Sequence, residues 1–328
     1  MWTKHSKRQG CHHHHGNYHL LPARKRQKMQ RRLLVTIAIN IGITLTEIII
    51  GIWAASMALL VDALHNFSDV LALILSLIGL YLLGRKAQNE QTFGYQRVEL
   101  VIGLINAISL IFIGLLALRP ALEFFIRYAQ NYVNGVPNSY DTLGLPIFIA
   151  SLISIIFNGL SVYILERGEH NSISTRSSVL HLFSDMLTSM AVCFAGIMIY
   201  FFGIYWLDPF VSLIISGYIL TGSFSLAKRS IQMLLNFNVT GIDVQDIRLA
   251  LCEEPEIYTV SHVHLWSLSE STIMLEAHVG VSADLSVSAL SGIKKKLKNI
   301  LFQKFHISHV TLEFHAAISG RQECQFET

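Results

Sequence analysis

Charged residues are scarce in this chain of 328 residues. Asp, Glu, Lys and Arg make up 14% of the sequence and hydrophobic residues 52%, whereas about a quarter of an average soluble domain is charged. This composition excludes an ordinary soluble protein. The four cysteines, at positions 11, 193, 252 and 324, have no paired spacing, so the sequence predicts no disulfide framework. The chain opens on a polar, His-rich stretch, which predicts that no cleavable signal peptide is present.

Acidic residues are absent from residues 1–32, which hold nine Lys and Arg. Residues 33–235 hold nine basic and eleven acidic residues in a largely apolar sequence, and residues 236–328 hold seven and eleven. We therefore expect three parts: a basic, His-rich cytoplasmic tail at 1–32, a transmembrane domain at 33–235 and a cytoplasmic domain at 236–328.

Long hydrophobic runs are confined to the middle part. A bilayer core about 30 Å thick needs roughly 20 apolar residues per helix, and six segments meet this requirement. They are residues 33–55, 57–83, 100–118, 143–165, 172–202 and 208–227. Lys and Arg gather in the connections on one side of these spans, which predicts that this side and both termini are cytoplasmic.

The C-terminal part has the pattern of a small α+β domain. Helices are expected at 243–253 and 288–301, and alternating strands at 259–268, 272–281 and 308–315. The predicted order is αββαβ. An open sheet edge in such a domain favours pairing with a second copy of the chain, so we expect a homodimer.

Two spans contain the same ionisable pattern, H-x-F-S-D, at His65 to Asp69 and at His181 to Asp185. Residues four apart share a helix face, and ionisable groups inside a bilayer are costly. One such residue alone could be a packing residue, but two copies at the same spacing favour a metal site near the membrane midplane. Two imidazoles and two carboxylates suit tetrahedral zinc and leave the filled site neutral.

Three further acidic residues lie in the spans. Asp62 shares a helix face with His65 and Asp69, which favours a supporting role beside the ligands over a position at the mouth or a capping role. Glu47 lies mid-span, where proton handling and a buried polar pair are equally compatible with the pattern. Asp208 precedes a proline and is expected to start a helix.

Histidines also gather outside the spans. Residues 12–15 are all His, with His5 and His19 nearby, which favours a flexible metal-collecting tail over a cloning tag. On the predicted strands, His264, His278 and His315 would form a cytoplasmic metal site, although exposed histidines without metal fit the pattern equally well.

The sequence resembles the cation diffusion facilitator family. The resemblance rests on S-M-A-L-L-V-D-A-L-H at 56–65 running into Asp69, F-G-Y-Q-R-V-E at 93–99, the second H-x-x-x-D, Asp208-Pro209, and H-L-W-S-L at 264–268. It implies six transmembrane helices, a metallochaperone-like αββαβ cytoplasmic domain and a homodimer that expels divalent metal in exchange for protons.

The resemblance also implies that His65, Asp69, His181 and Asp185 are the transport-site ligands, a set typical of zinc transporters. Two departures are Gln91, where many relatives have His before the F-G-Y loop, and His315, where relatives often have Glu or Asp. The short connection between spans four and five favours a bacterial inner-membrane protein.

The expected cycle needs no covalent chemistry. Zn²⁺ displaces protons from its ligands on the cytoplasmic side, the spans rock to expose the site outside, and protons then compete for the ligands. Organic cofactors, nucleic acid and enzymatic activity are not expected. A membrane-bound metal sensor is the alternative. An intramembrane zinc hydrolase is disfavoured because four ligands leave no open position for water and no H-E-x-x-H is present.

Overall fold

The computed structural model describes residues 23–83, 91–135, 142–166, 173–270, 272–317 and 325–326. Side chains are not described for 23–33, for parts of 73–83, or for 164–166 and 173–182. The His-rich tract at 12–15 and the predicted tail therefore lie outside the described residues. Two compact units are present, one from Arg26 to Ile231 and one that begins at Gln232, and each is considered by itself.

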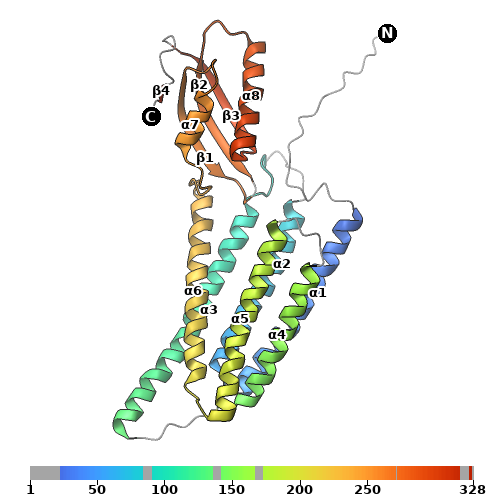
Figure 1. Ribbon diagram of the computed structural model, residues 1–328, viewed down its shortest axis with the longest axis vertical. Helices are drawn as coiled ribbons and strands as arrows, with labels where there is room; N and C mark the ends of the chain where they lie inside the picture. The colour runs from blue at the N-terminus through green and yellow to red at the C-terminus, as the bar shows by residue number, and fades with distance from the viewer. Residues whose placement is uncertain are drawn as a thin grey trace. The chain divides into compact units, whose positions relative to one another are not determined.

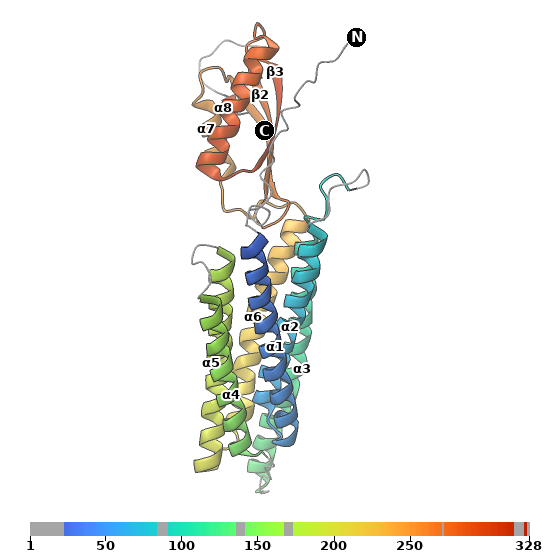
Figure 2. The same cartoon turned by 90° about the vertical axis from the view of Figure 1, so that its right-hand side faces the viewer.

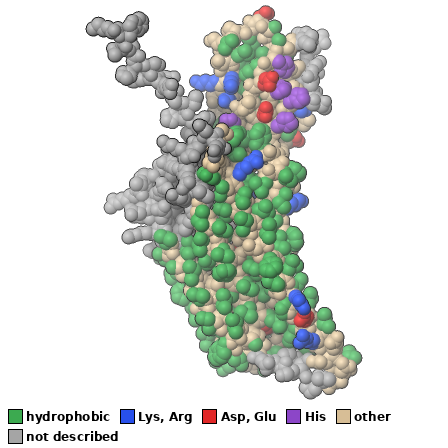
Figure 3. Space-filling view, turned by 180° about the vertical axis from the view of Figure 1, so that it is seen from behind, with side chains coloured by type: hydrophobic (Ala, Val, Ile, Leu, Met, Phe, Trp, Pro, Cys, Tyr) green, Lys and Arg blue, Asp and Glu red, His purple; other side chains and the backbone are tan. Residues whose placement is uncertain are grey.

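In the described residues, six long helices form the first unit (Figures 1 and 2). They are α1 (Ala23–Trp53), α2 (Met57–Leu83), α3 (Val98–Asn134), α4 (Gly144–Glu166), α5 (Ile173–Phe202) and α6 (Leu207–Leu234). Over the described residues, all of these except α2 are long and apolar enough to cross a membrane; α2 has 27 residues, some with undescribed side chains. Figure 3 shows one face of this unit covered mainly by hydrophobic side chains, as expected for contact with lipid. The predicted helical membrane domain is confirmed.

Helix α3 extends well beyond the C-terminal end of the predicted membrane span at 100–118. The helix runs through Pro120 to Asn134 and ends at Gly135, whose φ of 67° is left-handed. Proline removes one backbone hydrogen bond, but the following turns carry i, i+4 ion pairs of Glu123 with Arg119 (2.8 Å) and Arg127 (3.8 Å). Hydropathy detects only the apolar part of such a helix.

Helices α4 and α5 approach each other closely where α4 begins and α5 ends. A methyl group added to Gly196 would lie 2.7 Å from the backbone nitrogen of Phe148, and one added to Gly144 would lie 2.5 Å from that of Tyr200. The absence of a side chain at these two glycines therefore allows the backbones to meet, as small residues commonly do between membrane helices.

Asp208 joins α6 to the start of α2. Its carboxylate accepts hydrogen bonds from Ser56 Oγ (2.5 Å) and from the backbone N–H of Met57 (2.7 Å). Ser56 in turn accepts from the N–H of Leu59 (3.1 Å), as a helix N-cap does. Asp208 does lie in the first turn of α6, as expected for a helix start, but its side chain caps a helix about 150 residues away in the sequence.

The second unit contains α7 (Val244–Cys252), β1 (Thr259–Ser267), β2 (Ile273–Val281), α8 (Val287–Phe305), β3 (His309–Ala316) and the short β4 (Gln325–Phe326). The sheet order is β3-β2-β1-β4. Strands β1 and β2 are antiparallel, while β2 pairs in parallel with β3 after the α8 crossover. The predicted αββαβ order is confirmed, and β4 adds an edge strand that was not predicted.

The core of this unit lies between the sheet and its two helices. Its fully buried members come from both layers, and they include Ile247 of α7, Leu275 of β2 and Leu297 and Leu301 of α8. Asp243 and Ser286 cap the two helices by accepting from Gln245 N–H and Ala289 N–H. Such alternating strands and amphipathic helices are the pattern from which the domain was predicted.

The spacing of the cysteines predicted no disulfide framework, but one cysteine is paired. Cys252, at the end of α7, is disulfide-bonded, and its partner lies outside the described residues. Cys193 in α5 is a buried free thiol. Sequence spacing did not reveal the pairing because a disulfide requires proximity in space and not in sequence.

Candidate metal centre

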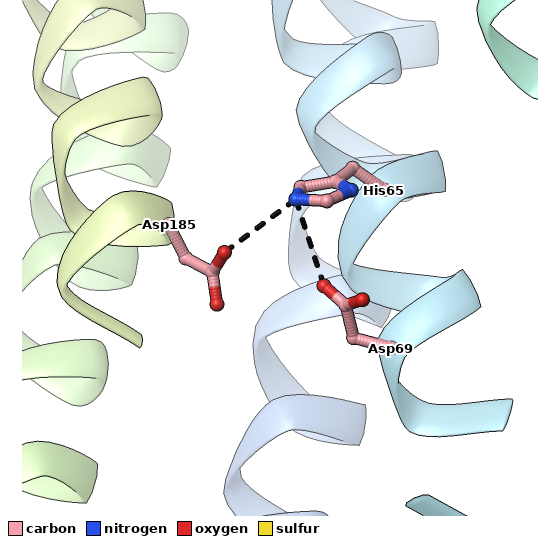
Figure 4. A group of neighbouring side chains, drawn as sticks. All are labelled: His65, Asp69 and Asp185. Carbon is pink, nitrogen blue, oxygen red and sulfur yellow. Dashed lines mark ion pairs between the residues drawn. The ribbon is translucent and has the colours of Figure 1, made fainter. Parts of the chain in front are cut away.

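Three predicted ligands lie together inside the helical unit. His65 and Asp69 project from α2 and Asp185 projects from α5 toward them (Figure 4). The Nε2 atom of His65 is 3.7 Å from Oδ2 of Asp69 and 3.5 Å from Oδ1 of Asp185. One ligand atom from each residue lies within 4.8 Å of the other two, and all three residues are buried.

These separations can be compared with the size of a zinc site. Zinc bonds of about 2.0 to 2.2 Å at tetrahedral angles place neighbouring ligand atoms about 3.4 Å apart. The two ion-pair distances, 3.5 and 3.7 Å, are close to this value, so a dication would fit with small side-chain adjustments. In the described part of the chain this is the one group of three or more His, Cys, Asp or Glu residues close enough to hold a metal.

The helical spacing explains how the site is assembled. His65 and Asp69 are one turn apart and share a face of α2, whereas Asp185 is brought in by the packing of α5 against α2. His181 lies one turn before Asp185 in α5, but its side chain is outside those described. Its part in the site therefore stays a prediction.

Asp62 connects α2 to α5 beside this group. Its carboxylate accepts hydrogen bonds from Thr188 (2.8 Å to Oδ1) and Ser189 (2.9 Å to Oδ2), and the side chain is fully buried. The Thr188 hydroxyl also lies 2.8 Å from the backbone carbonyl of Asp185. Asp62 is thus positioned to hold α5 in register with α2 next to Asp185. It is not within the three-residue group, and its supporting role stays a prediction.

Glu47 lies in α1 and is fully buried. The side-chain amide of Asn66, the residue after His65, donates to Oε2 of Glu47 at 2.8 Å. The Ser154 hydroxyl of α4 lies near the same carboxyl. The Ser154 hydroxyl lies 3.0 Å from that of Ser189. The hydroxyls of Ser154 and Ser189 therefore lie between Glu47 and Asp62, an arrangement that the sequence pattern did not reveal.

The three strand histidines predicted to bind metal are not brought together. No group containing His264, His278 and His315 meets the distance limit for shared ligation within the described residues. The ring of His278 instead lies beside that of His262, tilted by 46° with centroids 4.9 Å apart, and its Nε2 lies 3.4 Å from Oε2 of Glu313. Figure 3 shows histidine side chains gathered on one side of this unit.

A β-bulge explains the change of partner. The register of β1 against β2 shifts between Ser261 and His264, and His262 has a φ of 48°. Alternation places residues 262 and 264 on one face of the strand and does not choose between them, whereas the bulge re-aims side chains and brings the ring of His262 beside His278. The cytoplasmic metal site stays a prediction that the described distances do not favour.

Comparisons with known proteins agree with the division of the chain into two units. The cation efflux transmembrane domain matches residues 33–235, and the cation efflux protein cytoplasmic domain matches residues 239–315. The chain belongs to the cation efflux family. This confirms the resemblance to the cation diffusion facilitators and makes the chain a multi-pass membrane protein of a family of transporters, not of enzymes.

Several curated relatives cover almost the whole of this cation efflux protein. It is 32% identical over 301 residues to the cadmium, cobalt and zinc/H(+)-K(+) antiporter of Bacillus velezensis, which spans 90% of this chain and 92% of the relative. It is 30% identical over 296 residues to the zinc transporter ZitB of Yersinia pestis, with 90% of both chains covered. The metal cation efflux system protein CzcD of Cupriavidus metallidurans is 27% identical over 288 residues, with 88% and 87% covered.

Proposed function

We propose that this protein exports Zn²⁺ from the cytoplasm in exchange for protons, by alternating access to a site between α2 and α5. The observation that carries the proposal is the buried group of His65, Asp69 and Asp185, because two carboxylates and an imidazole gathered inside a membrane bundle offer the ligands and the negative charge that suit a dication. The names of relatives, which include zinc, cadmium, cobalt and antiport, support this choice.

We assign His181 as the fourth ligand. It repeats the spacing of His65 to Asp69 in α5, and a two-His, two-Asp set with Zn²⁺ is neutral. Imidazole nitrogen favours zinc, cadmium or cobalt over magnesium and calcium, which prefer oxygen ligands alone. The bound metal is the cargo, and no organic cofactor takes part.

Exchange follows from competition for the same side chains. Only a neutral imidazole and an ionised carboxylate can ligate, so metal binding releases protons and proton binding releases metal. A binding site near the bilayer midplane, reached from one side at a time, is the general plan of secondary transporters.

We place the protein in a bacterial inner membrane with both termini in the cytoplasm, because basic residues gather at the corresponding end of the spans. In this topology we assign three domains: a cytoplasmic tail at 1–32, a transmembrane domain at 33–235 and a cytoplasmic domain at 236–328. We also propose a homodimer through the cytoplasmic domain, supported by its family match.

Transport into liposomes tests the proposal. The purified full-length protein is reconstituted around a zinc-sensitive dye, a pH gradient is imposed, and Zn²⁺ entry is compared for wild type, Asp69→Ala and Asp185→Ala. Gradient-dependent entry that both variants lose is expected. The exposed Asp284→Asn variant is the control and should transport as wild type does. Zinc binding without any flux in the wild type would refute the carrier and favour a metal sensor.

A further inference from the structure

Glu47 is a buried carboxyl that the metal centre does not use. Its side chain is fully buried in α1, and Oε2 accepts from Asn66 while Oε1 accepts no well-formed hydrogen bond from the described residues. Neither Glu47 nor Asp62, whose charge acts on Glu47, pairs with a Lys or Arg among the described side chains. The other titratable groups that act on this pair are Asp185 of α5 and His65 of α2.

Counting hydroxyl hydrogens shows what the link between Glu47 and Asp62 requires. If Asp62 is ionised, Ser189 donates its one hydrogen to Asp62, and Ser154 must then donate to Ser189. No hydroxyl hydrogen is then left for Ser154 to give to Glu47, so a hydrogen bond between these two side chains has to be donated by a protonated Glu47. If the proton is on Asp62 instead, Asp62 donates to Ser189, Ser189 donates to Ser154, and Ser154 donates to an ionised Glu47. A row of hydroxyls that is hydrogen-bonded along its whole length thus requires one proton on this pair, on either of the two carboxyls.

The net charge of the buried groups also favours a proton on Glu47 or Asp62. With Zn²⁺ bound to two imidazoles and two carboxylates the metal site is neutral, so ionised Glu47 and Asp62 would leave two uncompensated negative charges in the buried interior. An isolated buried charge is far more costly than a neutral acid. At least one proton on this pair is therefore favoured even when metal fills the site.

A polar strip leads from Glu47 toward the end of the bundle where α1 begins. Helices α1 and α4 are antiparallel, since the backbone N–H at the start of α4 donates to the carbonyl of Ala54 just after α1 (3.0 Å). Buried polar residues continue along both helices from the Glu47 and Ser154 level. They are Thr36, Asn40 and Thr44 in α1, and Asn158 and Ser161 in α4.

Several of these groups lack partners, which points to buried water. Thr36 Oγ1, Asn158 Nδ2 and Ser161 Oγ have no hydrogen-bond partner among the described residues. Buried polar atoms are nearly always satisfied, by ordered water where protein groups are missing. At 1.5 Å per residue the strip from Thr36 to Glu47 is about 16 Å long, so it spans about half of a bilayer core about 30 Å thick.

We propose that Glu47 is a proton-binding site of the transport cycle, separate from the metal ligands and connected to the α1 end of the bundle by this strip. One proton binds the ionised Glu47 carboxylate to give the neutral acid, and the same proton leaves along the strip when the carboxylate forms again. Asp62 shares the proton through Ser154 and Ser189. The inference rests on the proposed exchange of metal for protons.

The test separates proton coupling from metal handling. Full-length wild type, Glu47→Gln and Ser154→Ala are reconstituted in liposomes, with Glu123→Gln, an exposed residue of α3, as the matched control. Two rates are measured: Zn²⁺ uptake driven by a pH gradient, and exchange of radioactive for unlabelled Zn²⁺ at equal pH on both sides. Glu47→Gln is expected to lower driven uptake at least about tenfold and to keep zinc exchange within about twofold. Ser154→Ala, which keeps the carboxyl but cuts the hydroxyl row, should lower driven uptake with exchange preserved.

The outcomes distinguish this inference from the proposed function. Driven uptake at the wild-type rate in Glu47→Gln would overturn the proton site while leaving zinc transport intact. Loss of both rates in Glu47→Gln, together with normal driven uptake in Ser154→Ala, would assign Glu47 a structural or metal-binding role and also overturn it. A wild type with no pH-dependent zinc flux would overturn the proposed function first, and the proton site with it.

Discussion

Replacing Asp185 by Asn tests the metal centre with the least disturbance of packing. Asn has the size of Asp and keeps one carbonyl oxygen, but it removes the negative charge that α5 places 3.5 Å from His65 Nε2. The filled site would then carry a net charge of +1 instead of zero in a buried position. Because loss of a supporting partner alone lowers metal affinity 10- to 100-fold, loss of a charged ligand should lower it at least about 100-fold, or about 2.7 kcal/mol.

Isothermal titration of the detergent-purified protein with Zn²⁺ measures this change. Asp284→Asn is the matched control, because it makes the same chemical change at an exposed position of the second unit. The control should bind as wild type does. If Asp185→Asn bound Zn²⁺ within about threefold of the wild type, the assignment of Asp185 as a ligand would be refuted.

Three further changes test other contacts. Gly196→Ala places a methyl against the α4 backbone at 2.7 Å and should lower the free energy of unfolding by about 1 to 3 kcal/mol, seen as a lower Tm in detergent; Gly217→Ala, with open space around it, should not, and an equal loss in both would contradict the close packing. Asp208→Asn weakens the hydrogen bonds that Asp208 accepts at the start of α2 and should lower the free energy of unfolding by about 0.5 to 2 kcal/mol; an unchanged Tm would argue against this capping role. His65→Asp should widen the range of metals transported, since an oxygen replaces a nitrogen ligand, and an unchanged metal profile would count against His65 as a ligand.

Local sequence patterns determined the helices and most of the strands. A hydrophobic run of about 20 residues has one favourable structure in lipid, because a helix satisfies every backbone hydrogen bond internally. Alternation in β1 and β2 and the one-turn spacing of His65 and Asp69 depend only on neighbours along the chain. These features carry over directly from sequence to structure, and with them the expectation that two pairs of ligands exist.

Contacts between distant segments could not be obtained in this way. The cap that Asp208 places on α2 and the hydroxyl row from Asp62 to Glu47 depend on how helices pack, and no local pattern encodes the partner. The bulge in β1 places the ring of His262 beside His278, because His262 lies within the bulge and has a positive φ that regular alternation does not allow for. Side-chain periodicity thus determined which residues are candidates for chemistry, whereas packing between helices and strands decided which of them meet.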